Sequence, residues 1–531
     1  MFKGGNKFMK NLVKKCICIL IVGLFLMTTN VSANQITSNG SKTQENNKVA
    51  FSNDNIKITF TVKEIRAYDK IDKLNDPDFY VKLNIEGQKV KSKTWKNQKY
   101  VKEEWSYTFD APNDKENINI TIELWDQDIG FDKLCDLTKN NNNKKQDYAA
   151  TIMYNIPSGH WRGSDYIDPE SIIYDESGYG RLNGCDDHSY NFNDRDCELR
   201  FDITQTDIDG DGIPAWVETN IYGTDPTVND TGRDDDNDGV PIEWEYKWGH
   251  LIYHNWWNHT WEHYWFYNPF VWEDHANFDI DEDGLDNIEE YKTSKWGSDP
   301  YRQDIFLELD QMEIGPNENS EYLSELSKDM LRDAYGKRNI LFLIDDGWMG
   351  GGELIPFNES TPFEDLQTYY YEYFLHKDYN NWRKGAFHYG MILYHTETAS
   401  GFCFPVWIEE NVTFDSFAIR RTYCDIQIYK FRIVNILVLK SINRHYRRSF
   451  IYASSIMHET GHILGINGGN TPGCDNRYTY FPWQRSWWKW RHYRSCMNYG
   501  YVFQIVDYSD GSNGKNDFND WARIDLRLFQ G

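Results

Sequence analysis

The clearest chemical signal in the sequence is a pair of histidines four residues apart, in Met457-His458-Glu459-Thr460-Gly461-His462. Residues i and i+4 of a helix lie on one face, so His458 and His462 can bind one zinc ion. Zinc lowers the pKa of a bound water to about 7, and Glu459 is placed to accept its proton. The sequence therefore predicts a hydrolytic zinc site with Glu459 as general base, on a helix that ends near Gly465.

A second motif, Ser495-Cys496-Met497-Asn498-Tyr499, follows downstream. Together with the histidine pair it makes residues 301–531 resemble the metzincin family of zinc metalloproteases. The resemblance implies an α+β zincin-type domain that hydrolyses a protein or peptide substrate. It also implies that Met497 forms a floor under the zinc ion, and that Tyr499 binds the metal or stabilises the oxyanion.

The third zinc ligand is where the sequence departs from that family. Metzincins carry a histidine or aspartate three residues after the glycine that ends the helix, and here that position is Gly468. Either the loop is shifted by one residue, or the ligand comes from elsewhere, with Asp475 preferred over His492. Two histidines and a carboxylate make an adequate catalytic zinc site. Without a third ligand the domain would either hold zinc weakly or be inactive.

Three copies of an acidic loop, with the pattern D-x-D-x-D-G-x5-E, occupy residues 206–300. The pattern supplies oxygens at loop positions 1, 3, 5 and 12, and its glycine permits a sharp turn around Ca²⁺. Acidic repeats ending in Asp-Pro resemble thrombospondin type 3 repeats, which implies a linker stabilised by calcium. The expected ligands are Asp207, Asp209, Asp211, Glu218, Asp234, Asp236, Asp238, Glu245, Asp279, Asp281, Asp283 and Glu290.

Residues 50–205 are expected to form an all-β sandwich, because period-two strand patterns alternate there with turn residues. Two acidic loops between these strands make the region resemble the calcium-binding sandwich of synaptotagmin and protein kinase C. The resemblance implies contact with a membrane or cell surface; solvated acidic turns without metal are the alternative. The calcium ligands it implies are Asp72, Asp78, Asp126, Asp128 and Asp132.

Residues 1–33 have the pattern of a secretory signal peptide: a lysine-rich start, an apolar run and the small residues Val31-Ser32-Ala33. An uncleaved anchor is the alternative. Residues 34–49 are polar and expected to be a disordered lead. Secretion would permit disulfides, and pairing sequence neighbours gives Cys185–Cys197, Cys403–Cys424 and Cys474–Cys496, with Cys135 left over.

Composition limits the partners. The 531 residues include 56 Lys+Arg and 82 Asp+Glu, a net charge of -26, which argues against binding nucleic acid.

In residues 301–531 the patterns predict strands at 304–309, 339–344 and 387–394 and a helix from Ser320 to Tyr335. Segment 425–442 is compatible with a helix or a strand.

The sequence as a whole predicts a secreted, multidomain zinc metalloendopeptidase stabilised by calcium. Two other hypotheses remain. One is a calcium-scaffolded surface or adhesion protein with an inactive protease domain. The other is a zinc hydrolase that acts on something other than peptides.

Overall fold

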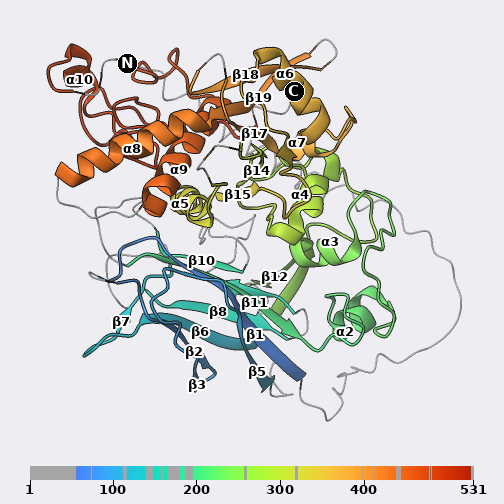
Figure 1. The fold of residues 1–531 in the computed structure, drawn as a ribbon. Coiled ribbons are helices and arrows are strands. Elements are labelled where there is room, and N and C mark those ends of the chain that lie inside the picture. The colour runs from blue at the N-terminus through green and yellow to red at the C-terminus, as the bar shows by residue number, and fades with distance from the viewer. Residues whose placement is uncertain are drawn as a thin grey trace, which may run out of the picture. The chain divides into compact units, whose positions relative to one another are not determined.

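The computed structural model describes residues 56–72, 75–111, 117–138, 148–156, 159–164, 180–185, 195–255, 260–316, 318, 321–396, 399–408, 411–437, 444–477, 479 and 481–527 (Figure 1). The predicted signal peptide (1–33) and disordered lead (34–49) lie outside these residues. No helix of the described part is long and apolar enough to cross a membrane.

The N-terminal described part is a sandwich of two antiparallel sheets, as the strand patterns predict. Alternate residues of each strand point inward, so that Ile58 and Phe60 of one sheet pack with Ile120 and Ile122 of the other. One sheet contains β1 (Ile56–Ala67), β4 (Tyr100–Val101), β5 (Trp105–Ala111), β10 (Arg181–Asn183) and β11 (Cys197–Gln205). The other contains β2 (Phe79–Ile85), β3 (Gln88–Lys91), β6 (Asn117–Asp126), β7 (Lys133–Leu134), β8 (Ala150–Asn155) and β9 (Trp161–Gly163).

The repeat segment consists of loops that each run into a short helix carrying the twelfth loop residue. The sixth loop residue has a positive φ in every copy, 91° at Gly212, 105° at Gly239 and 102° at Gly284, so the glycine prediction is confirmed. The elements are α2 (Ala215–Val217), η1 (Glu218–Tyr222), α3 (Ile242–Gly249), the hairpin β12 (His250–Asn255) and β13 (Thr260–Trp265), η2 (His275–Asn277), α4 (Asn287–Thr293) and η3 (Ser294–Trp296).

The C-terminal part is a mixed sheet with the strand order β15-β14-β17-β19-β18 and helices on both faces. Its strands are β14 (Asp304–Met312), β15 (Leu341–Asp345), β16 (Leu354–Ile355), β17 (His388–Leu393), β18 (Gly401–Ile408) and β19 (Asn411–Arg420). Its helices are α5 (Glu325–Gly336), α6 (Phe363–Tyr369), η4 (Tyr370–Phe374), α7 (Arg383–Ala386), α8 (Arg421–Leu437), α9 (Arg444–Ile463) and α10 (Arg485–Trp490).

Strand β14 is buried along its whole length and divides the two cores. Leu307 and Leu309 face the layer of α5 and α9, whereas Phe306 and Met312 face the layer of α6 and η4. Burial on both faces is typical of a central strand in a parallel sheet, and β14 is parallel to β15 and β17. All three strands predicted for this region are present.

Two helix predictions change. The first helix begins at Ser324, not Ser320, because Gln311 accepts a hydrogen bond from the Leu323 amide and holds the chain extended before Ser324. The described part of the ambiguous segment, 425–437, lies in the helix α8. Cys424 and Ile428, four residues apart, are buried while Ile426 is exposed, which is helical periodicity.

The cysteine pairings are not observed, since all seven cysteines of the described part are free thiols. Cys197 lies against Cys135, and its backbone amide donates to the Asp136 carbonyl. Cys403 and Cys424 contact separate points of α9, the Glu459 carbonyl and the Ser455 hydroxyl. Cys474 and Cys496 lie on adjoining segments but remain unbonded.

The sandwich and the C-terminal sheet belong to one compact unit, residues 55–531. Arg66 of β1 is 1% exposed, and its guanidinium donates to Asp329 (3.2 Å) and Asp333 (3.3 Å) on α5. It also donates to Glu64 at 2.7 Å. Lys99 also pairs with Asp333 at 2.7 Å and Arg332 with Glu64 at 3.1 Å, so Arg66 is the most buried cation of a charge network.

Arg66→Ala is therefore expected to destabilise the protein by about 3–5 kcal/mol, because it removes the buried cation of this network and leaves its carboxylates only partly compensated. The shift of the denaturant midpoint measures the effect. Lys63→Ala is the matched control: Lys63 lies on the same strand in an exposed pair with Glu104, worth less than about 1 kcal/mol. Equal midpoints for the two variants would contradict the role given to Arg66.

Candidate functional site

Helix α9 carries the histidine pair, and its C-terminus is shaped by Gly465. The Gly465 amide bonds the His462 carbonyl, the Ile466 amide bonds the Gly461 carbonyl, and Gly465 has a φ of 94°. This is a Schellman cap, which ends the helix and turns the chain back. The turn brings the Ile466 carbonyl to within 2.8 Å of His462 Nδ1.

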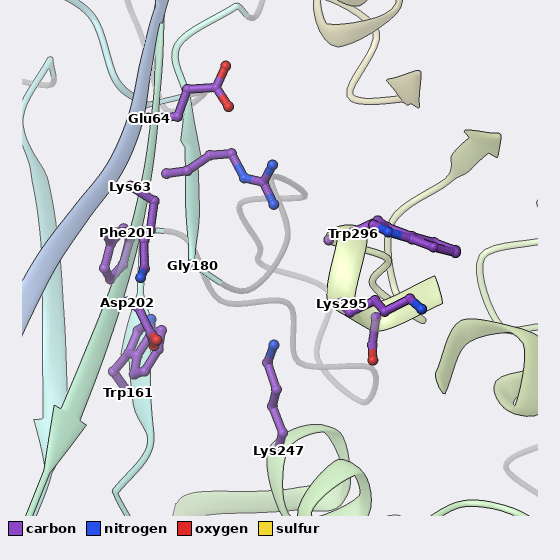
Figure 2. A pocket seen from close by; sticks show the side chains of 12 residues that line it. Lys63, Glu64, Trp161, Gly180, Phe201, Asp202, Lys247, Lys295 and Trp296 are labelled. Atoms are coloured by element: carbon purple, nitrogen blue, oxygen red, sulfur yellow. The ribbon is translucent and has the colours of Figure 1, made fainter. Parts of the chain in front are cut away.

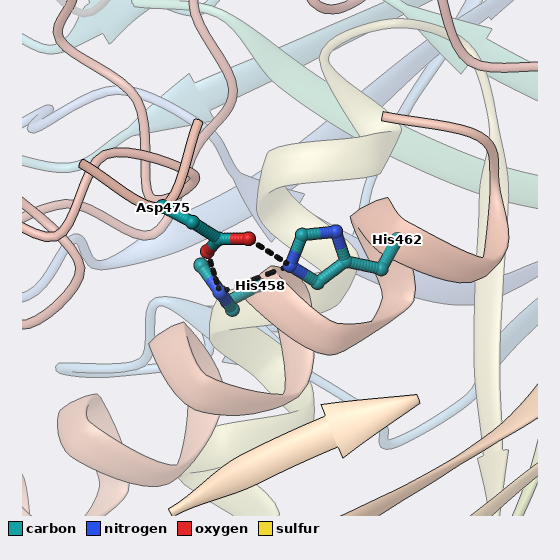
Figure 3. Close-up of side chains that lie close together, drawn as sticks. All are labelled: His458, His462 and Asp475. Carbon is teal, nitrogen blue, oxygen red and sulfur yellow. Dashed lines mark hydrogen bonds and ion pairs between the residues drawn. The ribbon is translucent and has the colours of Figure 1, made fainter. Parts of the chain in front are cut away.

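The two imidazoles converge with the carboxylate of Asp475 (Figure 3). The Nε2 atoms of His458 and His462 are 3.2 Å apart, and the Asp475 oxygens lie 3.3 Å and 3.5 Å from them. Four ligands at 2.0–2.1 Å from a tetrahedral zinc ion would be about 3.3–3.4 Å apart. The separation of the two nitrogens is close to this value, and each nitrogen faces a different oxygen of Asp475, Oδ1 for His458 and Oδ2 for His462, at a similar distance.

Hydrogen bonds to backbone carbonyls determine which nitrogen of each imidazole carries the proton. Nδ1 of His458 lies 2.8 Å from the Cys496 carbonyl, and Nδ1 of His462 faces the Ile466 carbonyl, so both Nδ1 atoms must donate. In neutral rings both Nε2 atoms then present lone pairs toward each other and toward Asp475. Such a set of acceptors requires a cation, and without a metal Asp475 outweighs burial and raises the pKa of His462 to about 9. These residues therefore fit a zinc ion.

Glu459 is 5% exposed, and its Oε2 atom has no hydrogen-bond partner. Burial raises its pKa, an effect that the two histidines partly offset. A Cβ added to Gly401, the first residue of β18, would lie 2.1 Å from Glu459 Oε1. Glu459 therefore lies under the edge strand of the sheet as an unpaired carboxyl group suited to proton transfer.

Met497 and Tyr499 both lie beside the histidine pair. Met497 is fully buried, and a Cβ on Gly461 would meet its sulfur at 2.5 Å, so its side chain packs against α9 between the two histidines. The Tyr499 ring stacks on His458 with centroids 5.6 Å apart. Burial, then the charge of Asp475, raises the pKa of the Tyr499 hydroxyl, which stays protonated and able to donate.

The loop after α9 explains why Asp475 and not residue 468 completes the cluster. Asn467 accepts hydrogen bonds from the amides of Gly469 and Asn470, and a Cβ on Gly468 would meet only open space. Asp475 is held by its amide, which donates to Met497, at a strained φ of 53°. His492 instead accepts from Arg491 Nε and is not part of the cluster.

In the first and third acidic loops the predicted ligands converge. Asp207, Asp209 and Asp211 form one cluster, and Glu218 Oε2 is buried without a hydrogen-bond partner. Burial, then Asp211, raises the pKa of Glu218 to about 7, the response of a carboxylate that lacks a cation. In the third loop, the same kind of unpartnered oxygens belong to Asp281 and Glu290.

The carboxylate cluster at the second loop includes two residues from outside the loop that the sequence did not identify as ligands. Glu273 and His275 join Asp238 and Glu245 in one cluster, with His275 Nε2 3.2 Å from Asp238. Burial, then Asp238, raises the pKa of Glu245 to about 10. The insert that contains β12 and β13 separates these residues from the loop, so no spacing signal could reveal them.

The predicted calcium ligands of the sandwich come together only in part. Asp72, Asp126 and Asp128 cluster, but the ammonium group of Lys133 lies among them, 2.6 Å, 3.3 Å and 2.7 Å from their oxygens. Asp78 and Asp132 lie beside this cluster and have partners of their own: Asp78 accepts from the Asn97 amide, and Asp132 accepts from the Tyr80 hydroxyl. The ammonium group of Lys133 thus lies within the three-carboxylate cluster, where the resemblance places calcium.

Lys133→Ala is expected to raise the calcium affinity of this cluster by at least about tenfold, since it removes a competing cation. Calorimetric titration of the full chain would show this as a new tight calcium site. Lys89→Ala, which removes an exposed charge on β3, is the control and should leave the titration unchanged. Identical curves for both variants would show that Lys133 does not compete with calcium.

Two large apolar side chains stand beside this cluster in the loop between β6 and β7. Ile129 and Phe131 are fully exposed. Their position between Asp128 and Asp132 puts apolar surface next to the acidic groups. Exposed apolar residues of this kind mark surfaces that contact membranes or proteins.

A cavity of about 380 Å³ lies between the sandwich and the repeat segment (Figure 2). Its lining includes the basic residues Lys63, Arg200, Lys247 and Lys295, and Lys247 extends from α3 toward its interior. None of the predicted zinc or calcium ligands lines this cavity. It is therefore separate from the cation sites.

A family model of the C2 domain matches residues 57–147. Similar solved structures include human GIVD cytosolic phospholipase A2 (17% identity, 28% of this chain and 16% of that chain, TM-score 0.17). They also include the structure of a C2 domain (15%, 28% and 98%, 0.16) and the first C2 domain of plant Extended Synaptotagmin 1 (9%, 29% and 94%, 0.17). This chain thus spans only a small part of the phospholipase, and no curated protein matches it.

Residues 57–147 are accordingly a C2 domain, a calcium-binding β-sandwich, as the acidic loops imply. Strand β11, which follows the matched residues, completes that sandwich by pairing with β1.

Proposed function

We propose that this protein is a secreted, calcium-stabilised zinc metalloendopeptidase. The observation that carries the proposal is the convergence of His458, His462 and Asp475 at zinc-ligand separations beside the buried Glu459. Secretion rests on the signal-peptide pattern of residues 1–33.

Each residue of this site would have a separate role in peptide hydrolysis. A zinc ion held by the two histidines and Asp475 would supply a Lewis acid. Glu459 would accept a proton from the attacking water and pass it to the leaving amine. The Tyr499 hydroxyl would donate a hydrogen bond to the developing negative charge.

The position of β18 supports a polypeptide substrate. β18 is the edge strand of the sheet, and among the described strands only β19 pairs with it. Its first residue, Gly401, is in contact with Glu459. An extended peptide that added to this edge would run past the general base, which is a recurrent way of binding peptides.

The sandwich would bring the enzyme to a membrane or cell surface. Its C2 character and the exposed Ile129 and Phe131 support this role. The proposal does not require calcium at the sandwich, because Lys133 already balances the acidic cluster.

The metal site is tested by comparing Asp475→Ala with His492→Ala. Asp475→Ala should weaken zinc binding by more than the 10–100-fold that outer-shell substitutions cost, about 100-fold or more, and casein hydrolysis should fall with it. His492→Ala, which removes the other candidate ligand, should retain zinc and activity. Zinc loss in His492→Ala, or full zinc retention in Asp475→Ala, would refute the ligand set.

A second outcome of these measurements would favour the hypothesis of an inactive protease domain. If the wild-type chain retains zinc but hydrolyses neither casein nor denatured proteins, then a calcium-scaffolded surface protein with an inactive protease domain is the better description.

A further inference from the structure

A second group of ionisable side chains lies on the face of the sheet opposite α9. Glu308 and Asp310 of β14 are both 0% exposed. As alternate residues of one strand they share a face with Phe306 and Met312, which pack toward α6 and η4. Carboxylates buried this deeply require counter-ions, protons or a metal.

Two further residues complete the group. One donor atom each from Glu308, Glu353 and His376 lies within 4.8 Å of the others. His376 Nδ1 is 3.5 Å from Glu353 Oε1. The loop between β15 and β16 covers the group so closely that a Cβ on Gly351 would lie 2.3 Å from Glu308 Oε2.

The protein's own donors satisfy part of this charge. Arg383 donates to Glu308 Oε2 and to Asp345. Asp310 accepts from the Tyr389 hydroxyl and from the Glu353 amide. What remains is Glu308 Oε1 and Glu353 Oε2, both buried and without a hydrogen-bond partner.

We propose that Glu308, Glu353 and His376 bind a second metal ion, a first-row divalent cation of the Mn²⁺ type. The fully buried Glu308 keeps one unpartnered oxygen, and an imidazole nitrogen belongs to the same group of candidate ligand atoms. Carboxylates with one imidazole suit such a cation, whereas calcium prefers an all-oxygen shell. The site is independent of the zinc ligands because the sheet lies between them.

Protonation is the competing way to satisfy the group. Burial outweighs Arg383 and raises the pKa of Glu308 to about 9, so a shared proton would also remove the unpartnered acceptor. The experiment must therefore count metal ions directly.

The test is Mn²⁺ titration of the full chain, followed by the electron paramagnetic resonance signal of free Mn²⁺. The histidine ligands of the zinc site are removed by His458→Ala and His462→Ala, and excess calcium occupies the acidic loops. This parent should bind one Mn²⁺ ion tightly. Glu308→Gln should abolish that binding, and His376→Ala should weaken it by more than about tenfold. Glu372→Gln, an exposed glutamate of η4, is the control.

No tight Mn²⁺ in the parent would overturn the proposal and favour shared protons. Unchanged binding in His376→Ala would overturn it equally, and displacement of Mn²⁺ by calcium would overturn the choice of metal. His376 has a side chain that is 39% exposed, so its substitution leaves the core intact and remains informative if Glu308→Gln does not fold.

Discussion

Glu459→Gln is expected to lower kcat for peptide hydrolysis by about 10²–10⁴-fold, the usual contribution of a general base. Glutamine keeps the size of the side chain but cannot accept a proton. Glu459 is not among the three clustered ligand residues, so the variant should retain its zinc. The measurement is the initial rate on a quenched peptide or casein, with zinc content determined on the same sample.

Glu364→Gln provides the control, because this glutamate is exposed on α6 and the substitution changes the net charge equally. It should leave kcat and zinc content unaltered. Wild-type rates in Glu459→Gln would mean that another group takes the proton, and the mechanism would be wrong.

Removal of calcium is expected to have the largest effect on stability. A loop at a calcium concentration 100 times its dissociation constant gains about 2.7 kcal/mol, so three loops would contribute about 8 kcal/mol. Without the ion, the unpartnered carboxylates of Asp209, Asp236 and Asp281 would repel their neighbours. Chelation of calcium with zinc held saturating should lower Tm and expose residues 206–300 to proteolysis.

The third loop should transmit this loss to the catalytic sheet. Asp283 of the loop accepts a hydrogen bond at 2.7 Å from the amide of Asp304, the first residue of β14. Glu290→Gln should therefore lower Tm and reduce activity in calcium. Glu282→Gln, an exposed residue of the same loop, should change Tm little. A Tm that does not respond to chelation would contradict the scaffold.

Local patterns were enough to predict the sandwich strands, the turn glycines of the acidic loops and the histidine helix. In each case the deciding interactions lie within a few residues. Gly465 ends α9 through bonds to Gly461 and His462, and Gly212 turns its loop next to Asp211. Such features depend on the backbone preferences of single residues and on the spacing of apolar residues, and both can be read from the sequence.

Features that depend on distant segments could not be predicted in the same way. The sequence favours Asp475 as the third zinc ligand but cannot establish it, because the position of Asp475 depends on the hydrogen bond from its amide to the Met497 carbonyl. Glu273 reaches Asp238 across an insert. Lys133 enters an acidic cluster that the pattern assigned to calcium alone. The place of Cys197 also depends on a distant segment, because its backbone pairs with Asp136 and brings it beside Cys135.

The most direct test of the central claim is anomalous diffraction at the zinc absorption edge, on crystals of the zinc-loaded chain. We expect one strong anomalous peak at about 2.0–2.2 Å from His458 Nε2, His462 Nε2 and an Asp475 oxygen. No peak at this position, or a peak that the Asp475 carboxylate does not contact, would contradict it.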